Sequence, residues 1–213
     1  MYGPPTRKVA EVMLDVKRQF GDESGVQLEE SDLVRWITNA QDQINYQNRV
    51  LKSTASIPSV VGQSVYTFPA SQVLQIESLH YKGVRIRNMT FAQAEETLIG
   101  VDPEAVGDPQ FWYEWGGTFT LWPAPDTTDT LTIYYTALVQ PVPTSWDSDT
   151  LLSLPDKYYN DIVSFVLQQA YEMDEDWQAS GAKAEQFKQS VDLKQEDERR
   201  SQDMTFSVIT LVD

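Results

Sequence analysis

Two consecutive amphipathic helices in the last third of the chain constrain its fold more than any other feature. Residues 154–173 and 177–202 place apolar side chains at the three- and four-residue spacing of helices with one buried face. These positions are Tyr158, Tyr159, Ile162, Val163, Val166, Ala170 and Met173 in the first helix, and Trp177, Ala184, Phe187 and Val191 in the second. The pattern predicts helices that pack against other helices, and it has no arrangement typical of a reaction centre.

A second pair of helices is predicted near the N-terminus. The first buries Val9, Val12, Met13, Val16 and Phe20 and stops at Gly21, and the second covers residues 31–52. We expect helices 31–52 and 154–173 to form the core contact within one subunit. The opposite face of helix 31–52 is rich in amides, at Asn39, Gln43, Asn45, Gln47 and Asn48. Amides suit contact with another polar surface, or they keep an exposed face soluble, and both interpretations stay open.

Between the helix pairs the pattern changes to strands. Strands are predicted at 64–68, 73–81, 84–89, 110–115, 118–122 and 131–138, with one short helix over 91–99 capped by Thr90. The sequence therefore predicts an α+β fold, in which an antiparallel β domain is inserted into a four-helix bundle. The expected boundaries are 1–52 with 151–202 for the bundle, 53–150 for the β domain and 203–213 for a C-terminal extended arm.

The predicted arm is strongly β-forming and has no partner strand near it in sequence. Residues 205–213 read TFSVITLVD. A lone strand cannot satisfy its own backbone hydrogen bonds, so it must pair with another strand. It could close the sheet of its own chain or add to the sheet of a neighbouring subunit, and we favour the neighbour because an exposed apolar strand aggregates.

Composition excludes several classes of function. The chain has 16 basic and 32 acidic side chains among 213 residues, a net charge of −16, and it has no cysteine. Such an acidic surface makes tight phosphate binding unfavourable. The charge fits simple solubility, or a surface that lies near DNA without holding it. No apolar run approaches the length of a membrane helix, and residues 1–5 lack a signal-peptide core, so we expect no membrane association.

Signals for catalysis are weak, and we expect neither enzymatic activity nor a cofactor. His80 is the single histidine and falls in a predicted strand, where a structural role is favoured. Asp174, Glu175 and Asp176 could gather a metal ion, but consecutive positions point in different directions, so we predict a solvated turn and no metal site.

An aromatic hairpin supports one alternative function. It holds Trp112, Tyr113, Trp115, Phe119 and Trp122, a composition like that of sugar-binding surfaces. Alternate residues of a strand face opposite sides, so some of these rings must be core. A carbohydrate- or receptor-binding β module is therefore the alternative interpretation.

Three segments in series carry a family resemblance. FTLWPAP at 119–125, LTIYYTA at 131–137 and LPDKYYNDIV at 154–163 follow the N-terminal helix pair in order. This series resembles the head-to-tail adaptor (connector, or neck) proteins of tailed bacteriophages, including the tail tubular protein A type, over roughly residues 30–200. The resemblance implies a structural ring, usually of twelve subunits, between the portal protein and the tail nozzle or tube. DNA would pass through the ring without specific binding during ejection. The protein would assemble in the host cytoplasm and reside in the neck or tail of the virion.

Two groups of residues are hypothetical contacts with other subunits or partners. The polar face of helix 177–202 offers Lys183, Lys188, Lys194, Arg199 and Arg200 opposite Glu185, Glu196 and Glu198, which suits ion pairs between subunits. The same residues could instead form local ion pairs on an exposed helix. The apolar residues Phe206, Val208, Ile209 and Leu211 of the C-terminal arm would contact a neighbouring subunit or the portal.

Overall fold

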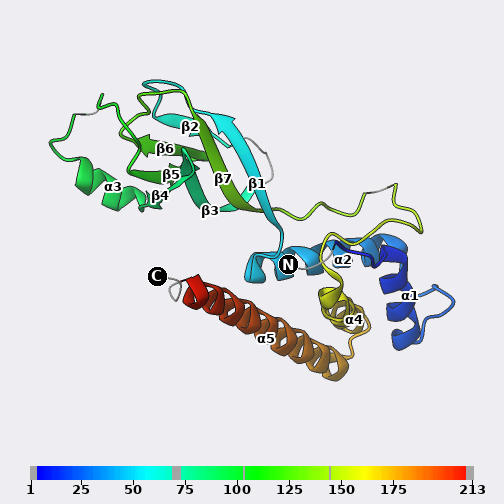
Figure 1. Ribbon diagram of the computed structural model, residues 1–213. Helices are drawn as coiled ribbons and strands as arrows, with labels where there is room; N and C mark the ends of the chain where they lie inside the picture. The colour runs from blue at the N-terminus through cyan, green and yellow to red at the C-terminus, as the bar shows by residue number, and fades with distance from the viewer. Residues whose placement is uncertain (1–3, 69–72, 103, 144, 210–213) are drawn as a thin grey trace. The chain divides into compact units, whose positions relative to one another are not determined.

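The chain divides into a helical unit and a β unit (Figure 1). The computed structural model describes residues 4–68, 73–102, 104–143 and 145–209, with side chains up to Arg200. The helical unit comprises residues 1–50 and 139–213, and the β unit comprises residues 51–138. The fold is α+β, as the sequence predicts.

The helical unit is built from α1 (Val9–Phe20), α2 (Glu30–Asn48), α4 (Tyr159–Met173) and α5 (Trp177–Ile209). Helix α4 packs against α1, α2 and α5. The predicted contact between helices 31–52 and 154–173 is therefore present, as the contact between α2 and α4. Gly21 ends α1 in a left-handed conformation, with φ of 92°. Helix α2 ends at Asn48 because Arg49 is also left-handed, so the predicted extension to residue 52 is wrong. None of the helices in the described ranges is both long and apolar enough to cross a membrane.

The prediction of a C-terminal β arm is wrong for the residues that the structure describes. Helix α5 continues through Ile209, so residues 203–209 are helical, and residues 210–213 lie outside the described part. A helix satisfies backbone N–H groups within its own segment, whereas a lone strand needs a partner. Extending an existing helix adds one hydrogen bond per residue without a new nucleation step. This propagation outweighs the β propensity of the segment.

The β unit contains one seven-stranded sheet in the order β1-β7-β3-β4-β5-β6-β2. Its strands are β1 (Lys52–Pro58), β2 (Val65–Thr67), β3 (Val73–Tyr81), β4 (Val84–Asn88), β5 (Phe111–Trp115), β6 (Thr118–Trp122) and β7 (Thr130–Ala137). The prediction of a purely antiparallel sheet is wrong, because β4 and β5 pair in parallel. Between them the chain forms α3 (Phe91–Leu98) and a loop, and this long connection allows the parallel return. Thr90 caps α3, as predicted.

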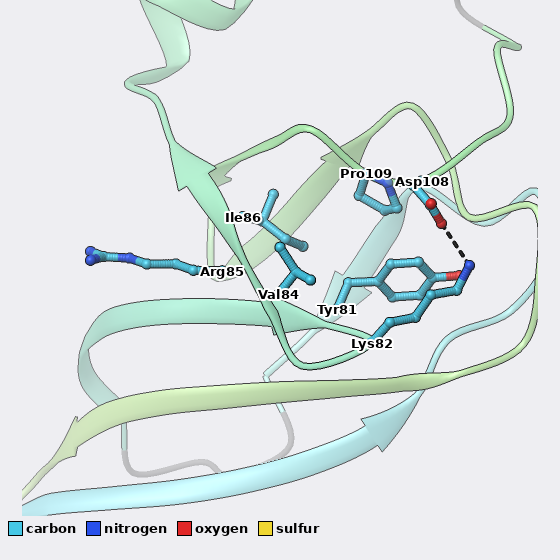
Figure 2. A pocket seen from close by; sticks show the side chains of 7 residues that line it. All are labelled: Tyr81, Lys82, Val84, Arg85, Ile86, Asp108 and Pro109. Atoms are coloured by element: carbon cyan, nitrogen blue, oxygen red, sulfur yellow. Dashed lines mark hydrogen bonds and ion pairs between the residues drawn. The ribbon is translucent and has the colours of Figure 1, made fainter. Parts of the chain in front are cut away.

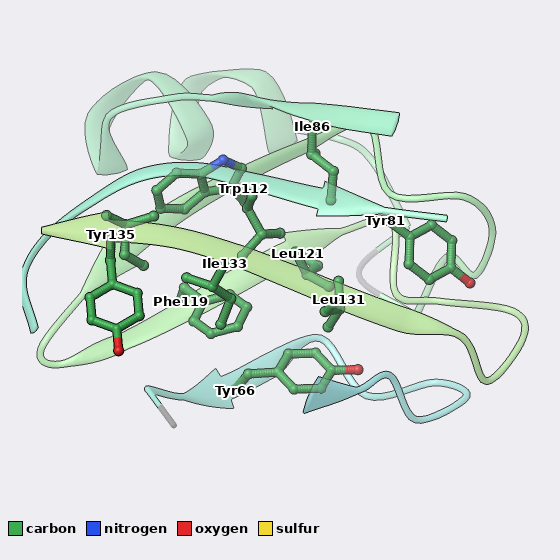
Figure 3. Packing of buried hydrophobic residues seen from close by; sticks show 11 residues of the cluster. Tyr66, Tyr81, Ile86, Trp112, Phe119, Leu121, Leu131, Ile133 and Tyr135 are labelled. Carbon is green, nitrogen blue, oxygen red and sulfur yellow. The ribbon is translucent and has the colours of Figure 1, made fainter. Parts of the chain in front are cut away.

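Alternation along the strands separates an apolar face from an outer face. The buried cluster in Figure 3 draws Leu79 from β3, Ile133 from β7 and Phe119 from β6. Phe119 is fully buried in this cluster, with its ring centroid 5.5 Å from that of Tyr66 in a stacked arrangement. Residues on the other face of the sheet, such as the cross-strand pair His80 and Thr132, point away from this cluster. The β unit therefore has its own core.

Candidate interaction surfaces

The side chains considered for chemistry do not converge. In the described ranges no group of three or more His, Asp or Glu side chains could hold a metal ion. His80 Nε2 lies 3.3 Å from the hydroxyl of Ser78, and its ring meets Tyr134 edge-on at 4.9 Å between centroids. Asp176 accepts a hydrogen bond from the backbone N–H of Ala179, at the start of α5. These contacts are those of structural residues.

A polar cluster fixes the middle of α5 against the start of α4. Lys194 of α5 forms an ion pair with Asp161, whose side chain is 2% exposed. Glu198 forms an ion pair with Lys157 and accepts a hydrogen bond of 2.9 Å from the Tyr158 hydroxyl. The ammonium groups of Lys157 and Lys194 lie 4.7 Å and 5.3 Å from the centre of the Tyr158 ring. Burial raises the pKa of Tyr158 to about 12.

Part of the amide-rich face of α2 completes this attachment. Gln47 Nε2 donates to Asp192 at 2.5 Å, and Gln195 Nε2 donates to the Gln47 carbonyl at 2.7 Å. Asn48 Nδ2 donates to the Val191 carbonyl and to the Tyr158 hydroxyl, each at 3.2 Å. The amide face therefore meets a polar surface of its own chain, while Asn39 and Gln43 remain exposed.

The five basic residues predicted for subunit contacts lie in different environments. Lys194 is held within the chain by Asp161, and Arg200 pairs with Glu196 one turn away at 3.3 Å. Lys188 and Arg199 are exposed and Lys183 is half-buried, and none of the three has an ion pair with a described residue. Phe206, Val208 and Ile209 lie within α5, and Leu211 lies outside the described residues.

The aromatic hairpin divides between core and surface. Trp112 is 2% exposed and belongs to the apolar cluster, so it cannot stack on a sugar. Trp115 is 61% exposed, but one face of its ring is stacked on Phe91 of α3 at 4.3 Å. Tyr113 meets Phe91 edge-on at 5.7 Å. Tyr113 and Trp115 thus anchor α3 to β5. Trp122 is half-buried and stacked on Phe111 at 5.3 Å, so Trp115 is the most exposed described ring of the hairpin.

Two surfaces stand out that the sequence interpretation missed. The first is on the outer face of the sheet, where Arg85 and Arg87 of β4 are both exposed. Their two-residue spacing in the strand VRIRN was the available signal. The second is the turn between α4 and α5, where Met173 and Trp177 are 47% and 70% exposed. Periodicity assigned both to a buried stripe, because it cannot tell where a stripe runs past its neighbours.

A small pocket of about 130 Å³ lies beside the first surface (Figure 2). Tyr81, Lys82, Asp108 and Pro109 line one side, and Lys82 pairs with Asp108 at 2.6 Å. The hydrogen bond to Asp108 raises the pKa of the Lys82 amine. Arg85 extends away from these side chains in Figure 2. The polar side chains on that side are already engaged, Lys82 with Asp108 and the Tyr81 hydroxyl with the Thr127 carbonyl at 3.0 Å.

The described residues form two separately packed units, and the side chains considered for chemistry lie apart within them. The chain belongs to the SU10 adaptor protein family, whose sequence profile matches residues 7–208. The resemblance to head-to-tail adaptor proteins is thereby confirmed at the level of the family.

Other comparisons add little. One similar solved structure is a chain from a neck of a native GTA particle computed with C12 symmetry. It is 17% identical, with 81% of this chain and 83% of that chain covered, and the TM-score is 0.21. At that score the likeness tells nothing further about fold or assembly. No curated protein matches the chain.

Proposed function

We propose that this protein is a head-to-tail adaptor of a tailed phage virion. Copies of the chain form a ring, of twelve subunits in our proposal, that joins the portal protein to the tail and surrounds the path of the ejected DNA. The observation that carries this proposal is the family match over residues 7–208, nearly the whole chain. The protein acts in the neck or tail of the virion after assembly in the host cytoplasm.

The charge of the chain supports a passage rather than a binding site for DNA. A net charge of −16 per subunit is repeated in every copy of a ring. Phosphates are repelled by such a surface, so DNA can move past it without being retained. Salt-dependent affinity for duplex DNA would contradict this role.

Contacts with partners are proposed for two parts of α5 and the residues beyond it. Lys183, Lys188 and Arg199 have no described ion pair and can reach another subunit. Arg200 would have to leave Glu196 of its own chain to pair with an acid of another subunit. Lys194 contributes indirectly, because it fixes α5 through Asp161. Residues 203–213, with Phe206, Val208, Ile209 and Leu211, would bind the portal or a neighbouring subunit.

The function is tested by mixing the purified chain with the portal protein of the same phage. We expect a complex whose mass, measured by native mass spectrometry, corresponds to a ring on the portal, and whose ring is visible by electron microscopy. Deleting residues 203–213 should weaken the complex while circular dichroism stays that of a folded protein. A chain with the same residues in scrambled order is the matched control. Absence of any complex with the portal would contradict the adaptor function.

The alternative, a carbohydrate- or receptor-binding module, has narrower support. It depends on Trp115, the exposed indole of the hairpin. Tryptophan fluorescence of the wild-type chain and of W115F, titrated with host surface glycans, tests it. A saturable change that disappears in W115F would favour this module over the adaptor.

A further inference from the structure

One half of the sheet is basic in an otherwise acidic chain. Strands β1, β7, β3 and β4 carry only four charged side chains, Lys52, Glu77, Arg85 and Arg87. Lys52 and Glu77 neutralise each other in an ion pair of 2.8 Å. Arg85 and Arg87 have no ion pair with a described residue. The two arginines are therefore a local excess of positive charge.

These arginines share the outer face of the sheet with two aromatic side chains. Arg85 pairs in register with His80 of β3, so both project from the same face, and Arg87 follows two residues later. His80 in turn packs edge-on against Tyr134 of β7, which is 42% exposed. We call Arg85, Arg87, His80 and Tyr134 the basic strand face. Such surfaces, rich in Arg and Tyr, are typical of the centres of protein interfaces.

The turn between α4 and α5 has the opposite charge. Met173 and Trp177 flank Asp174 and Glu175, all four are exposed, and neither acid has an ion pair with a described residue. We call these four residues the acidic turn. Its backbone is fixed, because the N–H groups of Asp174 and Asp176 donate to the carbonyls of Ala170 and Tyr171 at 3.1 Å and 3.0 Å. The acidic turn thus presents two exposed apolar side chains and the negative charges of Asp174 and Glu175, next to the exposed Asp176, whose carboxylate accepts from the Ala179 N–H.

We propose that the acidic turn of one copy docks on the basic strand face of the next copy. The interaction would pair Asp174 and Glu175 with the two arginines and place Trp177 against Tyr134 and the arginine stems. Because two different patches meet, the contact is heterologous, and repeating it gives a ring where its rotation divides the circle. Copies with a net charge of −16 repel one another at long range, so a local contact of opposite charges gives the approach its direction. The inference rests on the ring assembly proposed above.

Charge exchange between the two surfaces tests this interface. R85E/R87E and D174K/E175K each place like charges opposite one another, and we expect each to weaken self-association at low salt by about tenfold or more. The association is measured by sedimentation velocity of the full chain over a range of concentrations, with circular dichroism to confirm folding. Mixing the two variants restores opposite charges at both kinds of contact, so the mixture should associate more tightly than either variant alone.

A matched control separates pairing from net charge. The chain R85E/R87E/D174K/E175K should associate like the wild type, because the charges are exchanged within the interface. R85E/R87E/E95K/E96K has the same net charge, but its added lysines replace exposed acids of α3, outside both surfaces. If the two fourfold variants associated equally well, the proposal would be overturned. Unchanged self-association of R85E/R87E would overturn it too. A wild-type chain that stays monomeric at every concentration at low salt would also overturn it. Binding to the portal is measured separately, so loss of this interface leaves the adaptor function testable.

Discussion

The two units of the molecule bury polar groups to very different extents. Among the described residues, the buried polar side chains are Asp22, Gln41, Asn45, Asn48, Asp161, Ser164 and Ser180 in the helical unit, but only Ser59 and Thr136 in the β unit. The β unit is held by an apolar cluster that includes Phe119. The helical unit adds directional contacts, such as that of Asp161 with Lys194, to its apolar stripes. Apolar packing supplies most of the free energy in both, whereas the polar contacts fix the register of α5.

The largest effect should come from a cavity in the β unit. Phe119→Ala removes a ring that is fully buried and stacked on Tyr66. We expect the free energy of unfolding of the β unit to fall by about 3–5 kcal/mol, the usual cost of such a truncation. Urea unfolding followed by tryptophan fluorescence measures it, since Trp112 lies in the same cluster. Val84→Ala, at an exposed position of β4, is the control and should change the unfolding midpoint little. A loss below about 1 kcal/mol in the Phe119 variant would show that the cluster does not hold the unit.

Removing one partner of the buried ion pair should have the next largest effect. Lys194→Met leaves Asp161 buried without its cation, but the lysine side chain is 24% exposed, so solvent weakens the pair. We therefore expect a loss of about 2 kcal/mol in the helical unit, below the value for a fully buried pair. Chemical unfolding followed by circular dichroism at 222 nm measures this loss.

Two further variants define the origin of that loss. Lys183→Met removes a cation that has no described ion pair, and it should leave stability nearly unchanged. The double variant D161N/K194M removes both charges and should recover part of the loss. Equal losses in K194M and K183M would mean that the ion pair does not fix α5.

Alkaline pH should selectively destabilise the helical unit. Burial raises the pKa of Tyr158 from 10.0 to about 12, and burial together with Asp15 raises that of Tyr159. The folded state holds both phenol protons more tightly than the unfolded state, so their contribution is complete below pH 10. It is lost as the pH rises from about 10 towards 12, by up to about 2 kcal/mol for Tyr158.

The comparison variant for this pH dependence is Tyr158→Phe. It loses the hydrogen bonds to Asn48 and Glu198, so it should be less stable than the wild type at pH 7. Its stability should then fall less between pH 9 and pH 11, measured by urea unfolding at each pH. Tyr46→Phe, at a side chain that is 74% exposed, should follow the wild-type curve. If the stability of Y158F and of the wild type fell in parallel with rising pH, Tyr158 would not be the source of the pH dependence.

Sequence patterns predicted most elements because their signals are local. The apolar spacing located α1 and α4, Gly21 marked the end of α1, and Thr90 marked the start of α3. The errors arose where the structure depends on contacts distant in sequence, or where a helix and a strand compete for the same residues. The parallel pairing of β4 with β5 depends on the path of the connection, which periodicity does not encode. Residues 203–209 follow the preceding helix despite their β propensity.

The candidate surfaces were harder to predict than the fold. Lys194 was expected on an outward face, but its partner Asp161 is 33 residues away in sequence and meets it only through the packing of α4 and α5. Trp177 was assigned to a buried stripe, although it stands at the first position of α5, where the helix projects into the turn. Charge and hydrophobicity specify which residues can make contacts, whereas the tertiary packing decides which contacts remain for a partner.

The smallest effect should come from the exposed ion pair on α5. Arg200 and Glu196 lie one helical turn apart at 3.3 Å, with side chains 69% and 60% exposed. Solvent and the entropy of two long side chains offset most of this attraction, so Arg200→Ala should change the free energy of unfolding by no more than about 0.5 kcal/mol. The measurement is the same chemical unfolding used for K194M. Repeating it in high salt should remove even this small difference, because exposed pairs are screened. A loss of stability as large as that of K194M would contradict the expectation that exposure makes the ion pair of Arg200 and Glu196 weak.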